Sequence, residues 1–165
     1  LSLTAAYFDS EADKAGYDGS SAEYIVERGL VVDGIELELK GKVNDNLDVT
    51  FGYTSMDGKN GTKDAREIPE SMYSLWANYE VNPKLGWAVG VMHQGESLIK
   101  DGGTQMLPDY TRVDAAVYLM LSNDFRLQVN MENLTDELYF PHSHSTHQVS
   151  VGRERNIRLS LTRSF

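Results

Sequence analysis

The fold of this chain is decided by residues 34–54, which read GIELELKGKVNDNLDVTFGYT. In this stretch Ile35, Leu37 and Leu39 alternate with charged residues, and the alternation resumes after the polar turn at residues 44–46. Successive side chains of a β-strand point to opposite faces, so a period of two over about ten residues indicates strands with one apolar and one polar face. We therefore predict an all-β, antiparallel protein.

The same alternation recurs along the chain and predicts eight strands in up-and-down order. They are expected near residues 1–9, 31–43, 47–55, 71–81, 85–94, 109–121, 125–133 and 149–165. Short polar turns are expected at residues 44–46, 82–84 and 122–124, because Asn, Asp and Pro favour turns. Longer Gly-, Asp- and Ser-rich loops are expected at residues 10–30, 56–70, 94–108 and 134–148, with a further short strand pair as a candidate within 22–27. Outer-membrane barrels show this asymmetry, with short turns at one rim and long loops at the other.

Composition limits the remaining classes. The chain has 165 residues, enough for one domain, and no apolar run near the ~18 residues that a membrane helix requires. The net charge of -10, without Lys and Arg clusters, argues against nucleic acid as a partner. The absence of Cys removes disulfides and thiolate chemistry. Because Leu1 already belongs to a strand pattern, we expect a piece of a longer or processed protein.

Alternation alone fits a barrel in lipid and also a soluble, lipocalin-like barrel with an apolar interior. Two features favour lipid. The opposite parity carries ions within the strands, which a wet lumen tolerates. The apolar parity carries amphipathic rings at strand ends, as in an interfacial belt: Tyr53, Tyr73, Tyr79 and Trp87. We therefore predict that odd-numbered apolar residues face lipid and even-numbered polar residues line the lumen. Phe165, an aromatic directly after the last strand, is expected to be the signal read by the barrel assembly machinery.

Catalytic motifs are absent: the sequence has no Gly-x-Ser-x-Gly, Walker or dinucleotide fingerprint, so we assign no catalytic residue and expect no enzyme. His142, His144 and His147 are the one cluster with metal-ligand character. No carboxylate or thiolate completes a ligand set nearby, so we assign no resident metal or cofactor and expect a polar loop, with a transient contact with a ferric ligand and a structural metal as the two alternatives. Arg112 and Asp114, two residues apart on one strand, are predicted to form an ion pair.

Four segments carry a resemblance to a known family. Residues 34–54 resemble its strand-turn-strand run that ends in a GYT-like motif. LPDYTRVD at 107–114 and ENLTDELY at 132–139 are similar to its "LPgYtrvD" and "eNLtDkxY" motifs, and residues 152–165 resemble its closing strand. Almost end to end, the chain resembles the carboxy-terminal third of a TonB-dependent siderophore receptor.

The resemblance implies a fold and a function. It implies an antiparallel transmembrane barrel of 22 strands in the outer membrane of a Gram-negative bacterium, with residues 1–165 as its carboxy-terminal part. It implies import of a ferric siderophore with energy from the TonB complex, which acts through a plug domain that has no counterpart in these residues. The implied partners are the siderophore, TonB, outer-membrane lipid and the assembly machinery. Residues 153–155 depart from the family, which commonly has a Pro-Arg pair there.

Loop residues are the expected ligand contacts. The loop FPHSHSTHQ at 140–148 looks like that of the catecholate-type branch, so a ferric catecholate is the expected ligand. The candidate contacts are Tyr139, His142, His144 and His147, with Gln105 and Tyr110 behind them. Two alternatives remain open: a stand-alone eight-stranded outer-membrane barrel with adhesive or lipid-modifying activity, and a soluble lipocalin-like binder.

Overall fold

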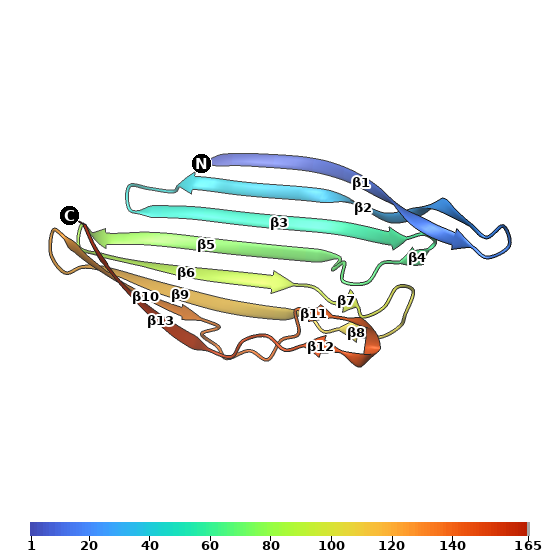
Figure 1. Ribbon diagram of the computed structural model, residues 1–165. Helices are drawn as coiled ribbons and strands as arrows, with labels where there is room; N and C mark the ends of the chain where they lie inside the picture. The colour runs from blue at the N-terminus through green and yellow to red at the C-terminus, as the bar shows by residue number, and fades with distance from the viewer. Residues whose placement is uncertain (165) are drawn as a thin grey trace.

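Eight long strands form one antiparallel sheet in a computed structural model that describes residues 1–164 (Figure 1). Their spatial order follows the sequence, so each strand pairs with the next long strand along the chain. They are β1 (Ser2–Asp18), β2 (Glu23–Lys42), β3 (Leu47–Asn60), β5 (Ser71–Asn82), β6 (Leu85–Gln94), β9 (Tyr110–Met120), β10 (Phe125–Glu132) and β13 (Asn156–Arg163). The predicted all-β, up-and-down class and the number of main strands are confirmed.

Short elements occupy the connections at one end of the sheet (Figure 1). β4 (Lys63–Asp64) pairs with β3, β7 (Ser97–Leu98) with β8 (Met106–Leu107), and β11 (His142–Ser143) with β12 (Val149–Ser150). A 3-10 turn, η1 (Ser145–His147), joins the last pair. Within residues 1–164, no helix has the length and apolar character needed to cross a membrane.

The register separates the two faces across the whole sheet. One row of directly paired residues is apolar and odd-numbered: Leu47, Tyr79, Trp87, Val117, Val129 and Leu159. The adjacent row is even-numbered and polar or small: Lys42, Asp48, Asn78, Ala88, Ala116, Asn130 and Arg158. Because a slip of one residue would exchange the faces, this continuity supports the predicted parity in six or more strands.

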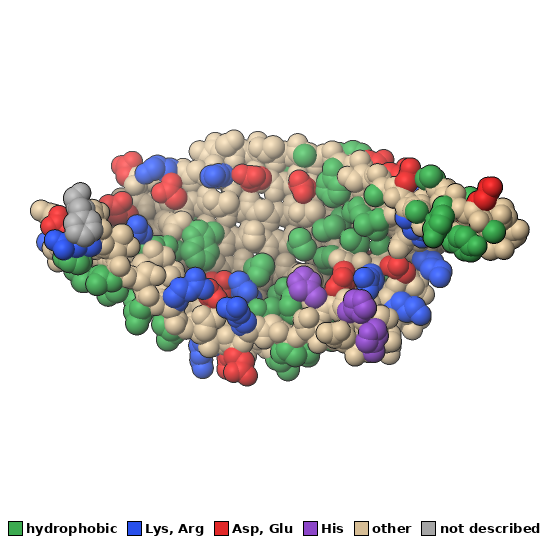
Figure 2. Space-filling view, viewed as in Figure 1, with side chains coloured by type: hydrophobic (Ala, Val, Ile, Leu, Met, Phe, Trp, Pro, Cys, Tyr) green, Lys and Arg blue, Asp and Glu red, His purple; other side chains and the backbone are tan. Residues whose placement is uncertain are grey.

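The two faces differ in exposure. On the apolar face Val89 is 37% exposed and Leu159 is 68% exposed, whereas Ala88 and Ala116 on the other face are 1% and 2% exposed. The face seen in Figure 2 is hollowed and has acidic and basic side chains scattered over it. The large apolar side chains therefore lie on the outside of the curved sheet. This is the opposite of the arrangement in a soluble barrel with an apolar interior.

Aromatic rings mark two levels on the apolar face. The rings of Tyr79 and Trp87 lie 5.4 Å apart near the short turns, and those of Tyr73 and His93 stack at 4.7 Å near the long loops. Six residue steps separate Tyr73 from Tyr79, or roughly 20 Å of strand at ~3.3 Å per residue. Outer-membrane barrels carry an apolar band about 25 Å tall between aromatic girdles. The spacing of the rings therefore fits a lipid-facing band.

The short turns are closed by side chains of their own residues. The Asn44 carboxamide oxygen accepts hydrogen bonds from the Asn46 and Leu47 amides at 2.9 and 3.0 Å. Asn82 does the same for Lys84 and Leu85 at 2.9 and 3.1 Å. Such local bonds stabilise a tight reversal without help from other parts of the protein. The predicted turns at 44–46, 82–84 and 122–124 are confirmed.

The predicted long loop at residues 10–30 is wrong. β1 and β2 continue as a hairpin that projects beyond the rest of the sheet, and only residues 19–22 separate the two strands (Figure 1). Cross-strand contacts replace an apolar face there: Arg28 pairs with Glu11 at 2.9 Å, and the rings of Tyr17 and Tyr24 lie 5.4 Å apart. A hairpin with polar residues on both faces lacks the alternation on which the prediction depended.

Two further boundaries differ from the predictions. β3 continues to Asn60 instead of residue 55, and β13 begins at Asn156 instead of residue 149. Residues 149–155 belong to the last loop, where Gly152 and Arg155 make backbone hydrogen bonds to loop residues rather than to β10. Phe165, the predicted assembly signal, lies outside the described residues.

Candidate functional site

Three long loops lie at the same end of the sheet, and we call residues 61–70, 95–109 and 133–155 the loop platform (Figure 1). All the ligand contacts predicted from the sequence lie in the platform or, for Tyr110, at the first residue of the strand that follows it. The third segment, residues 133–155, folds back against even-numbered residues of β9, which belong to the concave face.

Asn133 fixes the start of the third segment. It is 1% exposed and has a φ of 53°, a left-handed conformation that Asn tolerates better than most residues. Its amide N–H donates to Asp114 Oδ1 at 2.9 Å, and its Nδ2 donates to the carbonyls of Glu137 and Arg153 at 2.9 and 3.0 Å. Its Oδ1 accepts from the Glu137 amide at 2.8 Å. One residue, through its backbone amide and its side chain together, therefore joins both ends of the last loop to β9.

Tyr139 is buried beneath this loop. Its ring lies 4.6 Å from that of Tyr110, and each residue is 6% exposed. A Cβ on Gly152 would lie 2.2 Å from the Tyr139 ring, so only glycine lets the returning chain pass over the ring at this distance. The Tyr110 hydroxyl donates to Gln94 Oε1 at 3.3 Å. The structure thus brings Tyr110 and Tyr139 together, as parts that support the loop from below.

The predicted pair of Arg112 and Asp114 is confirmed, with Arg112 Nη2 donating to Asp114 Oδ2 at 2.9 Å. Arg112 Nη1 also donates to the Tyr139 hydroxyl at 3.2 Å. The Asp114 carboxylate also accepts a hydrogen bond from the Asn133 amide, so it links the Arg112 guanidinium to the start of the last loop. Charge-assisted bonds of this kind are stronger than neutral ones, and here they order the wall beneath the platform.

Ser143 joins all three segments of the platform. Its amide N–H donates to Glu67 Oε1 at 2.7 Å, and its hydroxyl donates to the Ile99 carbonyl at 3.3 Å. The Glu67 amide in turn donates to the Leu98 carbonyl at 2.9 Å. Glu67 has a φ of 57°, which is uncommon for a residue other than glycine. Residues far apart in sequence are therefore held as one unit.

The predicted histidine contacts lie on the outer part of the platform. His142 Nδ1 is 3.9 Å from Glu67 Oε1, and His144 Nδ1 is 3.4 Å from His147 Nε2. These three residues and Gln105 are exposed, and Figure 2 shows histidine side chains gathered over the platform. Within residues 1–164, no group of three or more His, Cys, Asp or Glu side chains is arranged to hold a metal ion.

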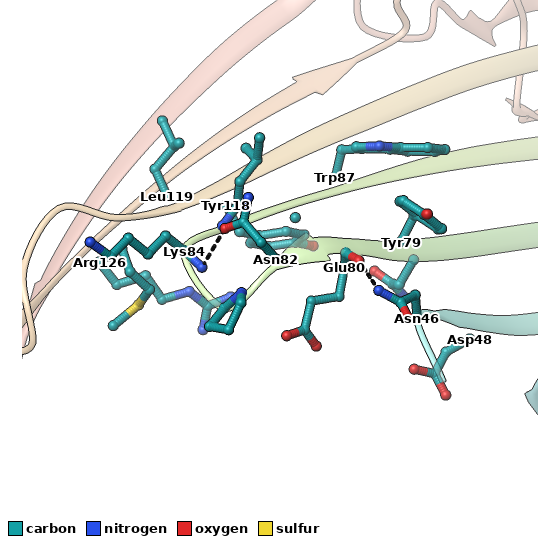
Figure 3. Close-up of a pocket in the computed structure, with 15 residues that line it drawn as sticks. Asn46, Asp48, Tyr79, Glu80, Asn82, Lys84, Trp87, Tyr118, Leu119 and Arg126 are labelled. Carbon is teal, nitrogen blue, oxygen red and sulfur yellow. Dashed lines mark hydrogen bonds between the residues drawn. The ribbon is translucent and has the colours of Figure 1, made fainter. Parts of the chain in front are cut away.

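A separate hollow of about 500 Å³ lies at the opposite end of the sheet, among the short turns (Figure 3). Its lining includes Asn46, whose Nδ2 donates to the Glu80 carbonyl at 2.7 Å, and Arg126, whose guanidinium lies 5.0 Å from the Tyr118 ring. These polar groups bind one another and the turn backbone. The hollow shares no residue with the loop platform, so we do not assign it to the predicted ligand contacts.

Sequence reasoning missed the residues that assemble the platform. Glu67 and Ser143 belong to loops with no periodic pattern, and their contact spans 76 positions. Asn133 was recognised as part of a motif, without its role as a hub. The ENLTD motif could have indicated a tight turn at this position, because Asn133 and Asp136 both adopt a positive φ, which Asn and Asp tolerate.

Residues 1–134 match the family described as "TonB dependent receptor-like, beta-barrel". The chain belongs to this family. TonB-dependent receptors are β-barrel proteins of the outer membrane of Gram-negative bacteria, so the predicted family and localisation are confirmed. The sheet of eight antiparallel strands, with the apolar row on its outer side, has the fold expected of the wall of such a barrel.

Relatives of known type cover nearly all of the chain. The probable TonB-dependent siderophore receptor PiuA of Acinetobacter baumannii is 28% identical over an alignment of 180 positions, gaps included, that covers 98% of this chain and 24% of PiuA. The crystal structure of PiuA matches with a TM-score of 0.83 at 26% identity, over 98% of this chain and 26% of that one. The ferrioxamine receptor of Yersinia enterocolitica is 29% identical over an alignment of 177 positions that covers 98% of this chain and 25% of that receptor. The chain thus spans about a quarter of the length of these TonB-dependent receptors.

Proposed function

We propose that this chain is the carboxy-terminal part of the barrel of an outer-membrane receptor that imports a ferric siderophore with energy delivered through TonB. The family match over residues 1–134 carries the proposal, and a relative named as a siderophore receptor that aligns with 98% of the chain supports it. In this function the residues supply barrel wall and external loops, and not an enzymatic activity.

The edges of the sheet favour an arc over a small closed barrel. β1 and β13 are the two ends of the strand order, and no pairing joins them within the described residues. A stand-alone eight-stranded barrel requires that pairing, because closure is what removes the unpaired edges. In the proposed receptor, other strands pair with these edges, and a plug domain and its TonB-contacting segment come from the rest of the protein.

The loop platform is the proposed contact surface for the ligand. Its exposed outer residues are His142, His144, His147 and Gln105, and Tyr110 and Tyr139 hold the loop from behind. Because the Glu67 carboxylate and the Ile99 carbonyl both accept hydrogen bonds from Ser143, the platform presents one ordered surface instead of three independent loops. Ordered loops bind with a smaller entropic cost than mobile ones.

A ferric catecholate is the proposed class of ligand, supported by the resemblance of residues 140–148 to the catecholate-type branch. Exposed imidazoles suit it, since they donate hydrogen bonds to the oxygens of an anionic complex. Ferrioxamine, named for one relative, is the competing candidate. A single assay that compares the ferric catecholate with ferrioxamine therefore distinguishes the two candidate ligand classes.

The uptake of radioactive iron by cells tests the function. Cells that carry the whole receptor are expected to accumulate iron from a ferric catecholate, and cells without the receptor or without TonB are expected not to. Uptake that persists without TonB would contradict the proposed energy source. Uptake from ferrioxamine but not from the catecholate would overturn the proposed class and leave the receptor function in place.

The ligand contacts are tested by changing His142, His144 and His147 together to Ala in the whole receptor. We expect ferric catecholate to bind at least tenfold more weakly, since loss of several hydrogen bonds to a charged ligand costs about 1.5–3 kcal/mol each. His93→Ala is the matched control, because His93 stacks on Tyr73 on the outer face. Unchanged affinity in the triple variant would remove these histidines from the site.

A further inference from the structure

His144 and His147 form a close imidazole pair at the tip of the β11–β12 hairpin. Nδ1 of His144 and Nε2 of His147 are 3.4 Å apart, with ring centroids 5.3 Å apart and the ring planes at 81°. Both residues are exposed, so solutes reach the two nitrogens from solvent. The tip is a built feature of the fold rather than two side chains on a free loop.

The backbone presents the two rings on one side. His144 precedes η1 and His147 ends it, and the tight turn between them, in which Ser145 has a φ of 65°, brings the two rings together. The His144 amide donates to the Gln148 carbonyl at 2.8 Å, which closes the tip, and β11 and β12 pair directly below it. Ser143, next to His144, is anchored to Glu67 and Ile99. The pair is therefore held before any ligand arrives.

The separation of the nitrogens matches a tetrahedral metal site. Two nitrogens that each lie about 2.0–2.1 Å from Zn²⁺ at the tetrahedral angle are about 3.3–3.4 Å apart. Imidazole is a preferred ligand of Zn²⁺, and it binds through a neutral nitrogen while the other ring nitrogen keeps the proton. The ring that donates in the present contact reaches this state by a change of tautomer, and binding also requires the two exposed rings to rotate until both lone pairs point at the metal.

We propose that His144 and His147 bind Zn²⁺ through these two nitrogens in an open tetrahedral site. The remaining two positions take water or the oxygen donors of an incoming molecule, since no third ligating side chain joins the pair among the described residues. The proposal goes beyond siderophore import, and it gives the structural metal that the sequence left as an alternative for this loop a defined pair of ligands and a named ion. What the sequence did not show is that the turn brings these two rings within ligand distance of each other.

Zinc titration of the whole receptor, purified in detergent without siderophore, tests the proposal. Isothermal calorimetry is expected to show a Zn²⁺ site that His144→Gln and His147→Gln each weaken by at least tenfold. Loss of a direct ligand should cost no less than the ~10–100-fold that is typical of outer partners of a metal. Gln keeps a polar side chain of similar reach in the hairpin, so the change removes the ligand without emptying the turn.

Two controls separate this site from other zinc-binding groups. His93→Ala and His142→Ala are expected to keep the affinity, because His93 lies on the outer face and His142 faces Glu67. Co²⁺, used as a spectroscopic probe, is expected to give the visible absorption of a tetrahedral complex in the parent and in neither Gln variant. Equal zinc binding by the parent and the His144→Gln/His147→Gln double variant would overturn the proposal. Because Zn²⁺ alone is measured, the result is independent of iron uptake.

Discussion

At the scale of single residues, Asn133 makes more hydrogen bonds within the loop platform than any of the ligand contacts predicted from the sequence. Asn133→Ala removes the side-chain bonds to Glu137 and Arg153. Each lost hydrogen bond costs about 0.5–1.5 kcal/mol. We expect the 134–155 loop to open, with limited proteolysis cutting it at least tenfold faster than in the parent. Asn130→Ala is the control, because Asn130 bonds only to Gln128 among the described contacts of its side chain; equal cleavage in both variants would argue against a hub.

Gly152 is the second residue whose identity the structure explains. In Gly152→Ala the new methyl group meets the Tyr139 ring at 2.2 Å, so the ring must move away from Tyr110 and Arg112. Overpacking of this kind costs about 1–3 kcal/mol. Chemical denaturation of the receptor in detergent measures the loss, and Gly19→Ala, where a Cβ meets nothing within 4 Å, is expected to have no effect. An unchanged midpoint in both variants would show that the loop adjusts freely.

At this scale, the sequence predicts contacts between residues that lie close together along the chain. Arg112 and Asp114 were recognised as a pair because residues two apart on a strand share a face. The contact between Glu67 and Ser143 depends on how two aperiodic loops cross, and no local pattern encodes such a crossing. The histidines were recognised by residue type, but their 3.4 Å approach depends on the closed turn at residues 144–148.

At the scale of elements, the loops are expected to move together because Glu67 joins them. Glu67→Ala removes the acceptor of the Ser143 amide, so the β11–β12 hairpin loses its bond to the segment 61–70. Hydrogen exchange followed by mass spectrometry is expected to show at least tenfold faster exchange around residues 142–150. Glu70→Ala, on the same segment, is the matched control and should leave exchange unchanged. If the two variants exchange alike, the loops are held by their own turns.

The strand elements show where periodicity predicts well and where it stops. β6 has the predicted bounds, 85–94, because large apolar residues recur at every odd position from Leu85 to Val91, between a polar turn and a loop. The projecting part of the β1–β2 hairpin lacks this alternation. Its charged residues, including the paired Arg28 and Glu11, are of the types that predict a loop. Alternation therefore marks the part of a strand that separates two media, and hydrogen bonding extends the strand beyond it.

At the scale of the whole molecule, the apolar face is expected to be the one that meets lipid, and two adjacent residues of β5 test this. Leu75 is 41% exposed on the apolar face, about midway between Tyr73 and Tyr79, and Ser74 is exposed on the concave face. Arginine on the lipid side of a barrel at the bilayer midplane costs about 2–4 kcal/mol, whereas the lumen tolerates charge.

Leu75→Arg is therefore expected to destabilise the whole receptor, folded in lipid vesicles, by about 2–4 kcal/mol. Ser74→Arg, the same change one position away, should cost less than 1 kcal/mol, because neither Gly52 nor Met92 beside it carries a charge. Urea titration of folding in vesicles measures both variants. Equal costs would contradict the assignment of lipid to the odd-numbered face, and a larger cost for Ser74→Arg would place lipid on the other face. The lumen, the platform and the barrel arc would then have to be reassigned, because all three depend on which parity meets hydrocarbon.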